Sequence, residues 1–384
     1  MLFPSLCTIV GGMSVSETAP RKTIAATEHR RCQPLPQRKT ATASPAKGAN
    51  PHRHHGLRTA DVRPMPDNET PTVRGSACPT WAACGTSGTA FTVGFMPSFS
   101  KGASAATREP IHLGSGEPVL LLHPFLLSQS VWEEVAQQLA ETGRYEVFAP
   151  TMAGHNGGPK AATYFLSSKV LADHVEQQMD ELGWQTAHIV GNSLGGWVAF
   201  ELERRGRARS VVGIAPAGGW TRWAPAKFEV IAKFIIALPV FALAWLFGPR
   251  VLHIPFSRRL ATYAISASPD VVTERQLSVI IDDVAHCPAY LQLLVKAFLM
   301  PGLQELAENE VPAHLVVCQK DRVVPAPRFS RHFTSNLPDD HRVTELDNVG
   351  HVPMFEAPGR VTEVIDDFLT ECMPHLRAVE PPAS

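Results

Sequence analysis

The sequence predicts an α/β protein built on a doubly wound, mostly parallel β-sheet. Beyond residue 105, apolar runs of strand length alternate with amphipathic runs of helical length. Strands and helices that alternate at this spacing imply right-handed crossovers between parallel strands. Several strand-like runs also end in loops that contain histidine, serine or aspartate. Because parallel strands end at a common edge of the sheet, these side chains are expected to meet there.

Composition divides the chain into two parts. Residues 1–105 are rich in Pro, Thr, Ser, Ala, Arg and His, and no apolar run there keeps a helical or strand period. We expect a disordered extension, or a mis-annotated one if translation starts at Met65 or Met96. Residues 106–384 form the second part, in which the strand–helix alternation stops between about residues 217 and 302.

Charge and cysteine usage bear on the partners and the compartment. The net charge of −1 over 384 residues provides no global field for a polyanion, so we expect no nucleic-acid partner. The seven cysteines are odd in number and scattered, and Cys287, Cys318 and Cys372 show no framework spacing. This usage suits a reducing compartment, and we expect a cytoplasmic location. The sequence implies no metal and no organic cofactor.

The second part opens with two strands that lead into loops of special composition. Residues 118–122 (Pro-Val-Leu-Leu-Leu) are wholly apolar, as expected of a strand buried on both faces. They are followed by a His-Pro-Phe sequence at 123–125 and by an amphipathic helix that ends before Gly143. The next strand, 145–149, opens into the loop 150–159, which is too rich in glycine to form a regular element.

The pentapeptide Gly-Asn-Ser-Leu-Gly at 191–195 stands between a β-rich run, 186–190, and a helix-compatible run, 196–203. A strand, a tight turn with serine at its apex and a following helix form a nucleophile elbow. The two glycines suit this turn, because the positions two before and two after the serine have no room for bulky Cβ substituents. The elbow aims a helix N-terminus at the site, where negative charge is favoured. Ser193 is therefore the candidate nucleophile.

After a further strand at 210–215, the alternation gives way to a stretch of helical segments. Its run 234–247 is the most apolar of the chain, but it has 14 residues and contains Pro239, whereas a membrane span needs about 20. We interpret it as two short helices of an inserted lid whose apolar faces cover the site and contact a bilayer surface peripherally. The runs 276–285 and 289–300 are expected to add further lid helices.

The alternating pattern resumes with strands at 313–318 and 343–346. Asp321 follows the first of them in a tight turn, and His351 follows the second on a loop; a helix at 361–370 closes the domain. A serine hydroxyl needs a positioned base, which a histidine provides. A buried carboxylate fixes the tautomer of that histidine. Asp321 and His351 are therefore the candidate acid and base.

The His-Pro-Phe loop, the Gly-His-Asn-Gly loop and the serine elbow together resemble the α/β-hydrolase fold superfamily, over roughly residues 108–372. The chain order Ser193, Asp321, His351 is the order of this superfamily, and each residue follows a predicted strand. A glycine-loop histidine with a structural role recurs in the superfamily, so the resemblance assigns His155 to that role. In the superfamily the lid sets substrate choice, which implies here an apolar acyl or aromatic group.

The resemblance also implies an oxyanion hole. Its donors would be the backbone N–H groups of Phe125 and Leu194. Pro124 has no N–H and stands where many members have glycine.

Three other carboxylates are assigned roles outside the triad. Asp347 is close to His351 in sequence but is expected to cap the turn after its strand. Asp282 and Asp283 are expected on the solvated face of a lid helix.

The resulting expectation is a serine hydrolase that cleaves an ester or thioester of a largely apolar small molecule through an acyl-enzyme. Serine at the elbow argues against epoxide-hydrolase and dehalogenase chemistry, in which an aspartate occupies that position. Three alternatives remain open: a carbon–carbon bond hydrolase or cofactor-free haloperoxidase-like enzyme on the same triad, a non-catalytic protein that binds an apolar ligand under the lid, and a protein anchored in a membrane by residues 234–247. The oligomeric state is left open.

Overall fold

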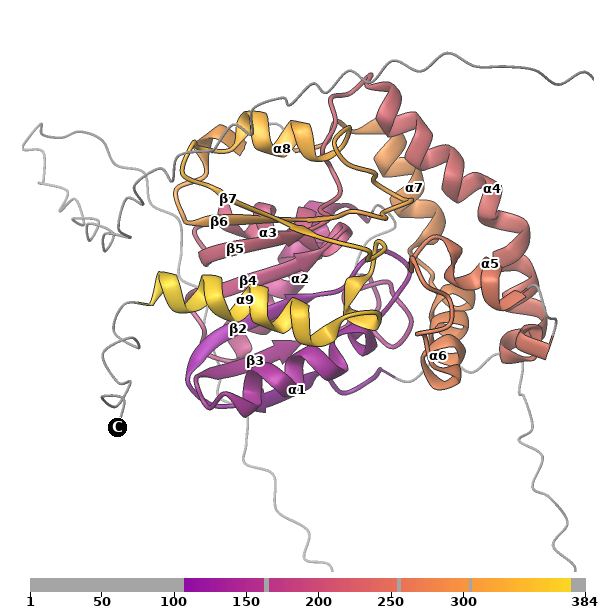
Figure 1. The fold of residues 1–384 in the computed structure, drawn as a ribbon, viewed down its shortest axis with the longest axis horizontal. Coiled ribbons are helices and arrows are strands. Elements are labelled where there is room, and N and C mark those ends of the chain that lie inside the picture. Colours follow the sequence, from indigo (N-terminus) through magenta and orange to yellow (C-terminus); the bar gives the residue numbers. More distant parts are fainter. Residues whose placement is uncertain (1–106, 162–165, 254–256, 304–305, 374–384) are drawn as a thin grey trace, which may run out of the picture. The chain divides into compact units, whose positions relative to one another are not determined.

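The computed structural model describes residues 107–161, 166–253, 257–303 and 306–373 (Figure 1). Seven strands form its sheet: β1 (Ile111–Gly114), β2 (Glu117–Leu122), β3 (Tyr145–Ala149), β4 (Ala187–Asn192), β5 (Ala208–Ile214), β6 (Ala313–Cys318) and β7 (Arg342–Leu346). Their order is β1-β3-β2-β4-β5-β6-β7, and every pair except β1–β3 is parallel. The predicted doubly wound sheet is thereby confirmed. The proposed extension at 1–105 lies outside the described residues.

Helices cover both faces of the sheet. One face packs against α1 (Glu133–Glu141) and α9 (Pro358–Cys372), and the other against α2 (Ser168–Glu181), α3 (Leu194–Glu203) and α8 (Ser330–Asn336). Successive strand residues point to opposite faces, so Leu121 joins the first of these two cores and Leu120 joins the second. Burial on both faces explains why the central strands are continuous apolar runs.

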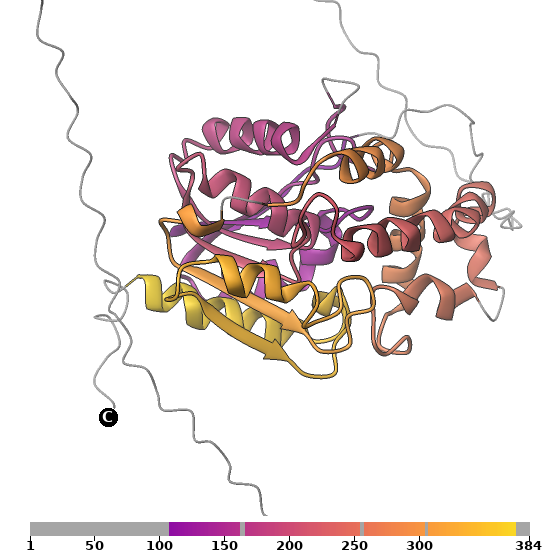
Figure 2. The same ribbon diagram turned by 90° about the horizontal axis from the view of Figure 1, so that it is seen from above.

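Four helices, which we call the lid, lie beyond the carboxyl ends of the parallel strands, on the right of the sheet in Figures 1 and 2. They are α4 (Pro225–Phe247), α5 (Ser257–Tyr263), α6 (Glu274–Ala285) and α7 (Tyr290–Leu299), and a short 3-10 helix, η2 (Gly248–His253), joins the first two. The predicted helices 276–285 and 289–300 correspond to α6 and α7. The capping box that starts α6, between Thr273 and Gln276, gives its N-terminus a local sequence signal.

The prediction of two short helices on either side of Pro239 was wrong, because α4 runs through the proline without ending. A proline inside a helix removes one backbone hydrogen bond and crowds the preceding turn. Here tertiary packing holds the helix on both sides of it. Phe234 packs edge-on against Phe125, and Phe241 packs edge-on against Tyr290. Both halves of α4 therefore rest on the same aromatic group.

Three further parts of the fold were not predicted. Strand β1 pairs antiparallel with β3 at the edge of the sheet, with Ile111 opposite Ala149. Its four residues are too few, and too exposed, to show a clear pattern. The short helices α5 and α8 also lack a strong periodic signal, with seven residues each.

Candidate active site

Ser193 occupies a strained turn between β4 and α3. Its backbone has φ 54° and ψ −111°, a conformation that residues other than glycine rarely adopt. A Cβ on Gly191 would overlap the Gly195 carbonyl, and a Cβ on Gly195 would overlap the Leu122 carbonyl. Glycine is needed on both sides of the serine because the backbone of a neighbouring segment occupies the space that a Cβ would take.

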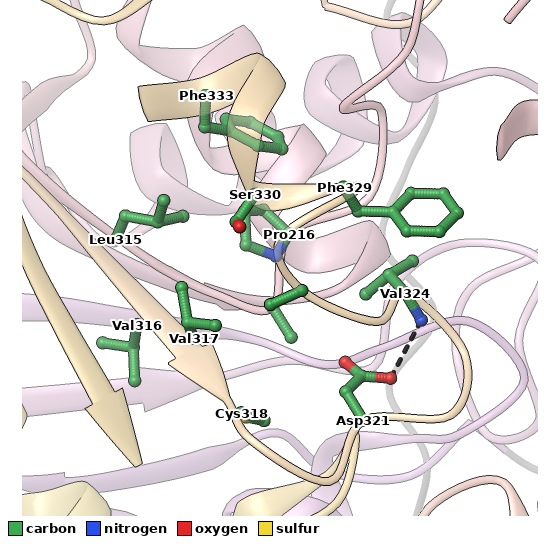
Figure 3. Close-up of a pocket in the computed structure, with 12 residues that line it drawn as sticks. Pro216, Leu315, Val316, Val317, Cys318, Asp321, Val324, Phe329, Ser330 and Phe333 are labelled. Carbon is green, nitrogen blue, oxygen red and sulfur yellow. Dashed lines mark hydrogen bonds between the residues drawn. The ribbon is translucent and has the colours of Figure 1, made fainter. Parts of the chain in front are cut away.

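His351 and Asp321 form a buried pair. The Nδ1 atom of His351 lies 2.7 Å from Oδ2 of Asp321, and both residues are almost fully buried. The other carboxylate oxygen accepts the N–H groups of Val323 at 2.7 Å and Val324 at 2.9 Å; the latter bond is dashed in Figure 3. Since Asp321 accepts at Nδ1, that nitrogen carries the proton and Nε2 is left as the base.

Asn192 joins the elbow to the histidine loop. Its side-chain amide donates to the carbonyl of His351 at 3.0 Å and to that of Ile214 at 2.9 Å. The residue that precedes Ser193 is therefore fixed to the residue that carries the imidazole. Through these bonds the turn that carries Ser193 lies next to the loop that carries His351, and His351 is bonded in turn to Asp321.

The loop after β2 supplies the second predicted backbone donor. Among the described residues, neither the Phe125 nor the Leu194 N–H donates to a protein acceptor. Leu194 is the first residue of α3, where backbone N–H groups have no intrahelical partner. The loop is strained at Leu126, which has φ 71°. Both N–H groups are thus without a protein acceptor, as the predicted oxyanion hole requires.

His123 fixes this loop to the next one. Its Nε2 accepts the N–H of Met152 at 2.9 Å, and its Nδ1 donates to the Pro124 carbonyl at 2.8 Å. Burial is the main reason why the pKa of His123 lies well below its usual value. Because the imidazole is neutral and both nitrogens are engaged, His123 holds the loop after β2 against the loop after β3.

Aromatic rings of α4 and α7 pack against the loop that follows β2. Phe125 stacks on Tyr290 of α7, with ring centroids 5.9 Å apart, and packs edge-on against Phe234 of α4. The Tyr290 hydroxyl donates to the Phe234 carbonyl at 2.7 Å, which ties α7 to α4. His155 packs edge-on against Phe125, and burial lowers the pKa of His155 to about 4. This aromatic cluster therefore joins the loop after β2 to both α4 and α7.

The prediction that Asp283 lies on the solvated face of α6 was wrong, because this side chain is buried. It is 1% exposed and accepts hydrogen bonds from Ser128 at 2.5 Å and from Asn156 at 3.2 Å. Arg108 forms an ion pair with it at 2.8 Å and also reaches the half-exposed Asp282. Asp283 thus fastens the lid to the two loops that flank the site. This role could not be predicted from the sequence, because all three partners lie more than 100 residues away along the chain.

A second set of bonds fastens the lid to the catalytic loops. Glu356 accepts the Ala267 and Ser268 N–H groups with one oxygen and the Gly350 N–H with the other. Arg322, beside Asp321, donates to the carbonyls of Tyr263 and Ser266. The segment after α5 is thus bonded to the immediate neighbours of both His351 and Asp321.

Asp347, by contrast, is exposed, and it is Asp321 that bonds the histidine. An apolar cavity lies behind Asp321, lined by β6, the loop after β5 and α8, with Pro216, Val317 and Phe333 among its residues (Figure 3). Neither Ser193 nor His351 lines this cavity.

A model of the "Alpha/beta hydrolase family" matches residues 119–364. The chain belongs to this family. It is 71% identical over 213 residues to "Epoxide hydrolase EphH" of Mycobacterium tuberculosis, which covers 56% of this chain and 100% of that protein. It is 26% identical over 292 residues to "Putative carbamate hydrolase RutD" of Azorhizobium caulinodans, over 72% of this chain and 99% of that one.

Solved structures agree on the fold. A thermophilic esterase from Thermogutta terrifontis superposes with a TM-score of 0.55 at 20% identity, over 69% of this chain and 93% of that one. Family membership and these relatives support hydrolase activity for this α/β hydrolase. They leave open which bond it cleaves.

Proposed function

We propose that this chain hydrolyses carboxylic esters or thioesters of a largely apolar acyl group through an acyl-enzyme on Ser193. The observation that carries the proposal is the buried His351–Asp321 pair, 2.7 Å apart, in a domain whose elbow presents a serine. A serine hydroxyl is reactive only beside a positioned base, and this pair supplies one with a fixed tautomer.

The geometry supports the following sequence of steps. Ser193 Oγ attacks the substrate carbonyl while its proton passes to Nε2 of His351. The tetrahedral oxyanion accepts hydrogen bonds from the Phe125 and Leu194 N–H groups. His351 then gives its proton to the leaving alcohol or thiol, and the acyl group stays on Ser193. A water molecule deprotonated by His351 attacks the acyl-enzyme, which releases the acid and restores the serine.

The aromatic cluster at the loop after β2 supports an apolar acyl group. Phe125, Phe234, Phe241 and Tyr290 pack together there through ring faces and edges. The hydroxyl of Tyr290 is engaged by the Phe234 carbonyl, so that ring offers substrate an apolar face. Burial of hydrocarbon against such rings favours binding by about 25 cal/mol per Å².

Epoxide hydrolysis is the second candidate, because a relative 71% identical over 213 residues carries that name. The chemistry of Ser193 argues against it. If a serine oxygen opened an epoxide, the product would be an alkyl ether on the enzyme, with no carbonyl for water to attack. A carboxylate nucleophile forms an ester instead, which water can cleave. Ser193 could therefore not turn over an epoxide through a covalent intermediate.

A substrate panel separates the two candidates. We expect the purified chain to hydrolyse p-nitrophenyl butyrate and a butyryl thioester and to form no diol from styrene oxide. Ser193→Ala is expected to lower the esterase kcat by about 10⁴-fold or more. Diol formation in the wild type that survives in Ser193→Ala, together with absent ester hydrolysis, would replace the esterase proposal by the epoxide one.

A further inference from the structure

Exposed hydrophobic side chains are concentrated on the lid. Among the described residues, every large hydrophobic side chain that is exposed, except Leu113 and Val343, lies between Trp223 and Met300. The most exposed are Ile236 (76%), Trp223 (74%), Trp245 (63%), Leu246 (62%) and Leu291 (62%). We call Trp223 and the exposed hydrophobic residues of α4 and α7 the lid apolar surface. A contiguous surface of this kind marks an interaction site.

The exposed residues of α4 and α7 belong to one surface. Phe228 of α4 packs edge-on against Phe298 of α7, with ring centroids 6.0 Å apart. The Lys227 ammonium, on a buried side chain, donates to the carbonyls of Phe298 at 2.7 Å and Met300 at 2.8 Å. These bonds hold the end of α7 against the start of α4, so the exposed residues of the two helices adjoin there.

Apart from Glu229, which forms an ion pair with Lys233, the charged residues of α4, η2, α5 and α7 are all cationic. Between Glu229 and Asp270 the sequence contains no carboxylate, whereas it contains Lys233, Arg250, Arg258 and Arg259. Arg222, Arg250 and Arg259 are exposed. An apolar surface bordered by cations is complementary to an anionic lipid surface. Two copies of this chain joined through the same surface would instead bring like charges together.

We propose that the lid apolar surface docks on an anionic lipid bilayer, with α4 lying along the interface. Trp223 and Trp245 stand near the two ends of this helix. Indole rings favour the interface because they combine an apolar body with a polar N–H. The exposed arginines then reach the lipid phosphates while the side chains between them enter the acyl boundary.

Docking along the surface fits α4 better than crossing the bilayer. The stretch Pro225–His253 is long and apolar enough to span a membrane, and 17% of its most apolar window is buried. However, Val230 and Ile231 are buried against the domain, and Phe234 and Phe241 belong to the aromatic cluster at the loop after β2. A spanning α4 would have to give up these contacts. The proposal does not depend on which bond Ser193 cleaves.

Vesicle flotation with the full chain tests the proposal. We expect the wild type to float with vesicles of phosphatidylcholine and phosphatidylglycerol, and to bind pure phosphatidylcholine vesicles at least tenfold more weakly. Ile236→Asp/Trp245→Asp is expected to abolish flotation. Arg222→Gln/Arg259→Gln is expected to weaken binding to the mixed vesicles by about tenfold or more, since each cation near an anionic surface contributes about 1 kcal/mol.

The matched control is Leu113→Asp/Val343→Asp, which places the same charges on exposed hydrophobic positions outside the lid and should leave flotation unchanged. Hydrolysis of a soluble short-chain ester, measured without vesicles, should be equal in all these proteins. If the wild type hydrolyses the ester but does not float, docking is wrong and the proposed hydrolase function is unaffected.

Three further results would overturn docking. They are undiminished binding by Ile236→Asp/Trp245→Asp, retention in vesicles after a carbonate wash, and a wild-type dimer that this variant dissociates and that does not bind vesicles.

Discussion

In the proposed mechanism, three side chains from distant segments divide the chemistry of the site. Ser193 is held in a strained backbone conformation, His351 is oriented through Nδ1, and Asp321 is fixed by two backbone N–H groups. Each interaction removes a degree of freedom that the reacting groups would otherwise lose during the reaction. The residue scale is also where the sequence was most informative, because each of the three follows a strand.

The role of Asp321 gives the first prediction. Asp321→Asn should leave the fold intact and lower kcat for p-nitrophenyl butyrate by about 10³- to 10⁴-fold, because the amide no longer favours the reactive tautomer of His351. KM should change little. Asp347→Asn, an exposed carboxylate close to His351 in sequence, is the control and should retain wild-type rates. Equal losses in the two variants would argue against Asp321 as the acid.

At the scale of elements, the nucleophile elbow could be predicted because its requirements are local. The glycines on either side of the serine answer contacts within one turn and with the neighbouring strand. The continuous course of α4 could not be predicted from the sequence. Pro239 gives a strong local signal for a helix end, and the contacts of Phe234 and Phe241 override that signal. The burial of Asp283 was also missed, since its partners come together only in the folded domain.

The elbow gives the second prediction. Gly195→Ala should abolish activity and destabilise the domain, because the new methyl group would overlap the Leu122 carbonyl. Gly359→Ala in α9 is the matched control, since no atom lies within 4 Å of its added Cβ. Urea unfolding and ester hydrolysis measure both effects. A fully active and stable Gly195→Ala protein would show that the turn has another geometry.

The third prediction concerns the bonds between lid and catalytic loop. Glu356→Gln replaces one carboxylate oxygen by a donor that faces the N–H of either Gly350 or Ala267. We expect a loss of about 1–3 kcal/mol in the free energy of unfolding and a fall in kcat, because the Gly350 N–H is adjacent to His351. Glu363→Gln, an exposed position in α9, should change neither quantity. A variant with unchanged stability and unchanged kcat would show that the Glu356 bonds do not couple the lid to the loop that carries His351.

At the scale of the whole molecule, the apolar cores on the two faces of the sheet hold several neutral histidines. Burial lowers the pKa of His155 to about 4 and that of His314 to about 3. An unfolded imidazole has a pKa near 6.5, so the unfolded chain takes up these protons first as the pH falls. Stability is therefore full above about pH 6.5 and declines below it, toward the folded pKa values.

The fourth prediction follows from this decline. Each such histidine should lower the free energy of unfolding by about 1.4 kcal/mol per pH unit below pH 6.5. Urea denaturation at pH 7.5, 6.5 and 5.5 measures the slope. His314→Gln should reduce it by the contribution of one proton, since this side chain no longer titrates. An unchanged slope in His314→Gln would mean that His314 does not stay neutral in the folded state.

In the proposed mechanism Ser193 carries the acyl group during turnover. Its most direct test is rapid acid quenching of the chain with p-nitrophenyl butyrate, followed by mass spectrometry of its peptides. We predict a butyryl adduct on the peptide that contains Ser193, short-lived in the wild type and absent from Ser193→Ala. An adduct on another residue, or turnover of the ester at the wild-type rate by Ser193→Ala, would contradict the account.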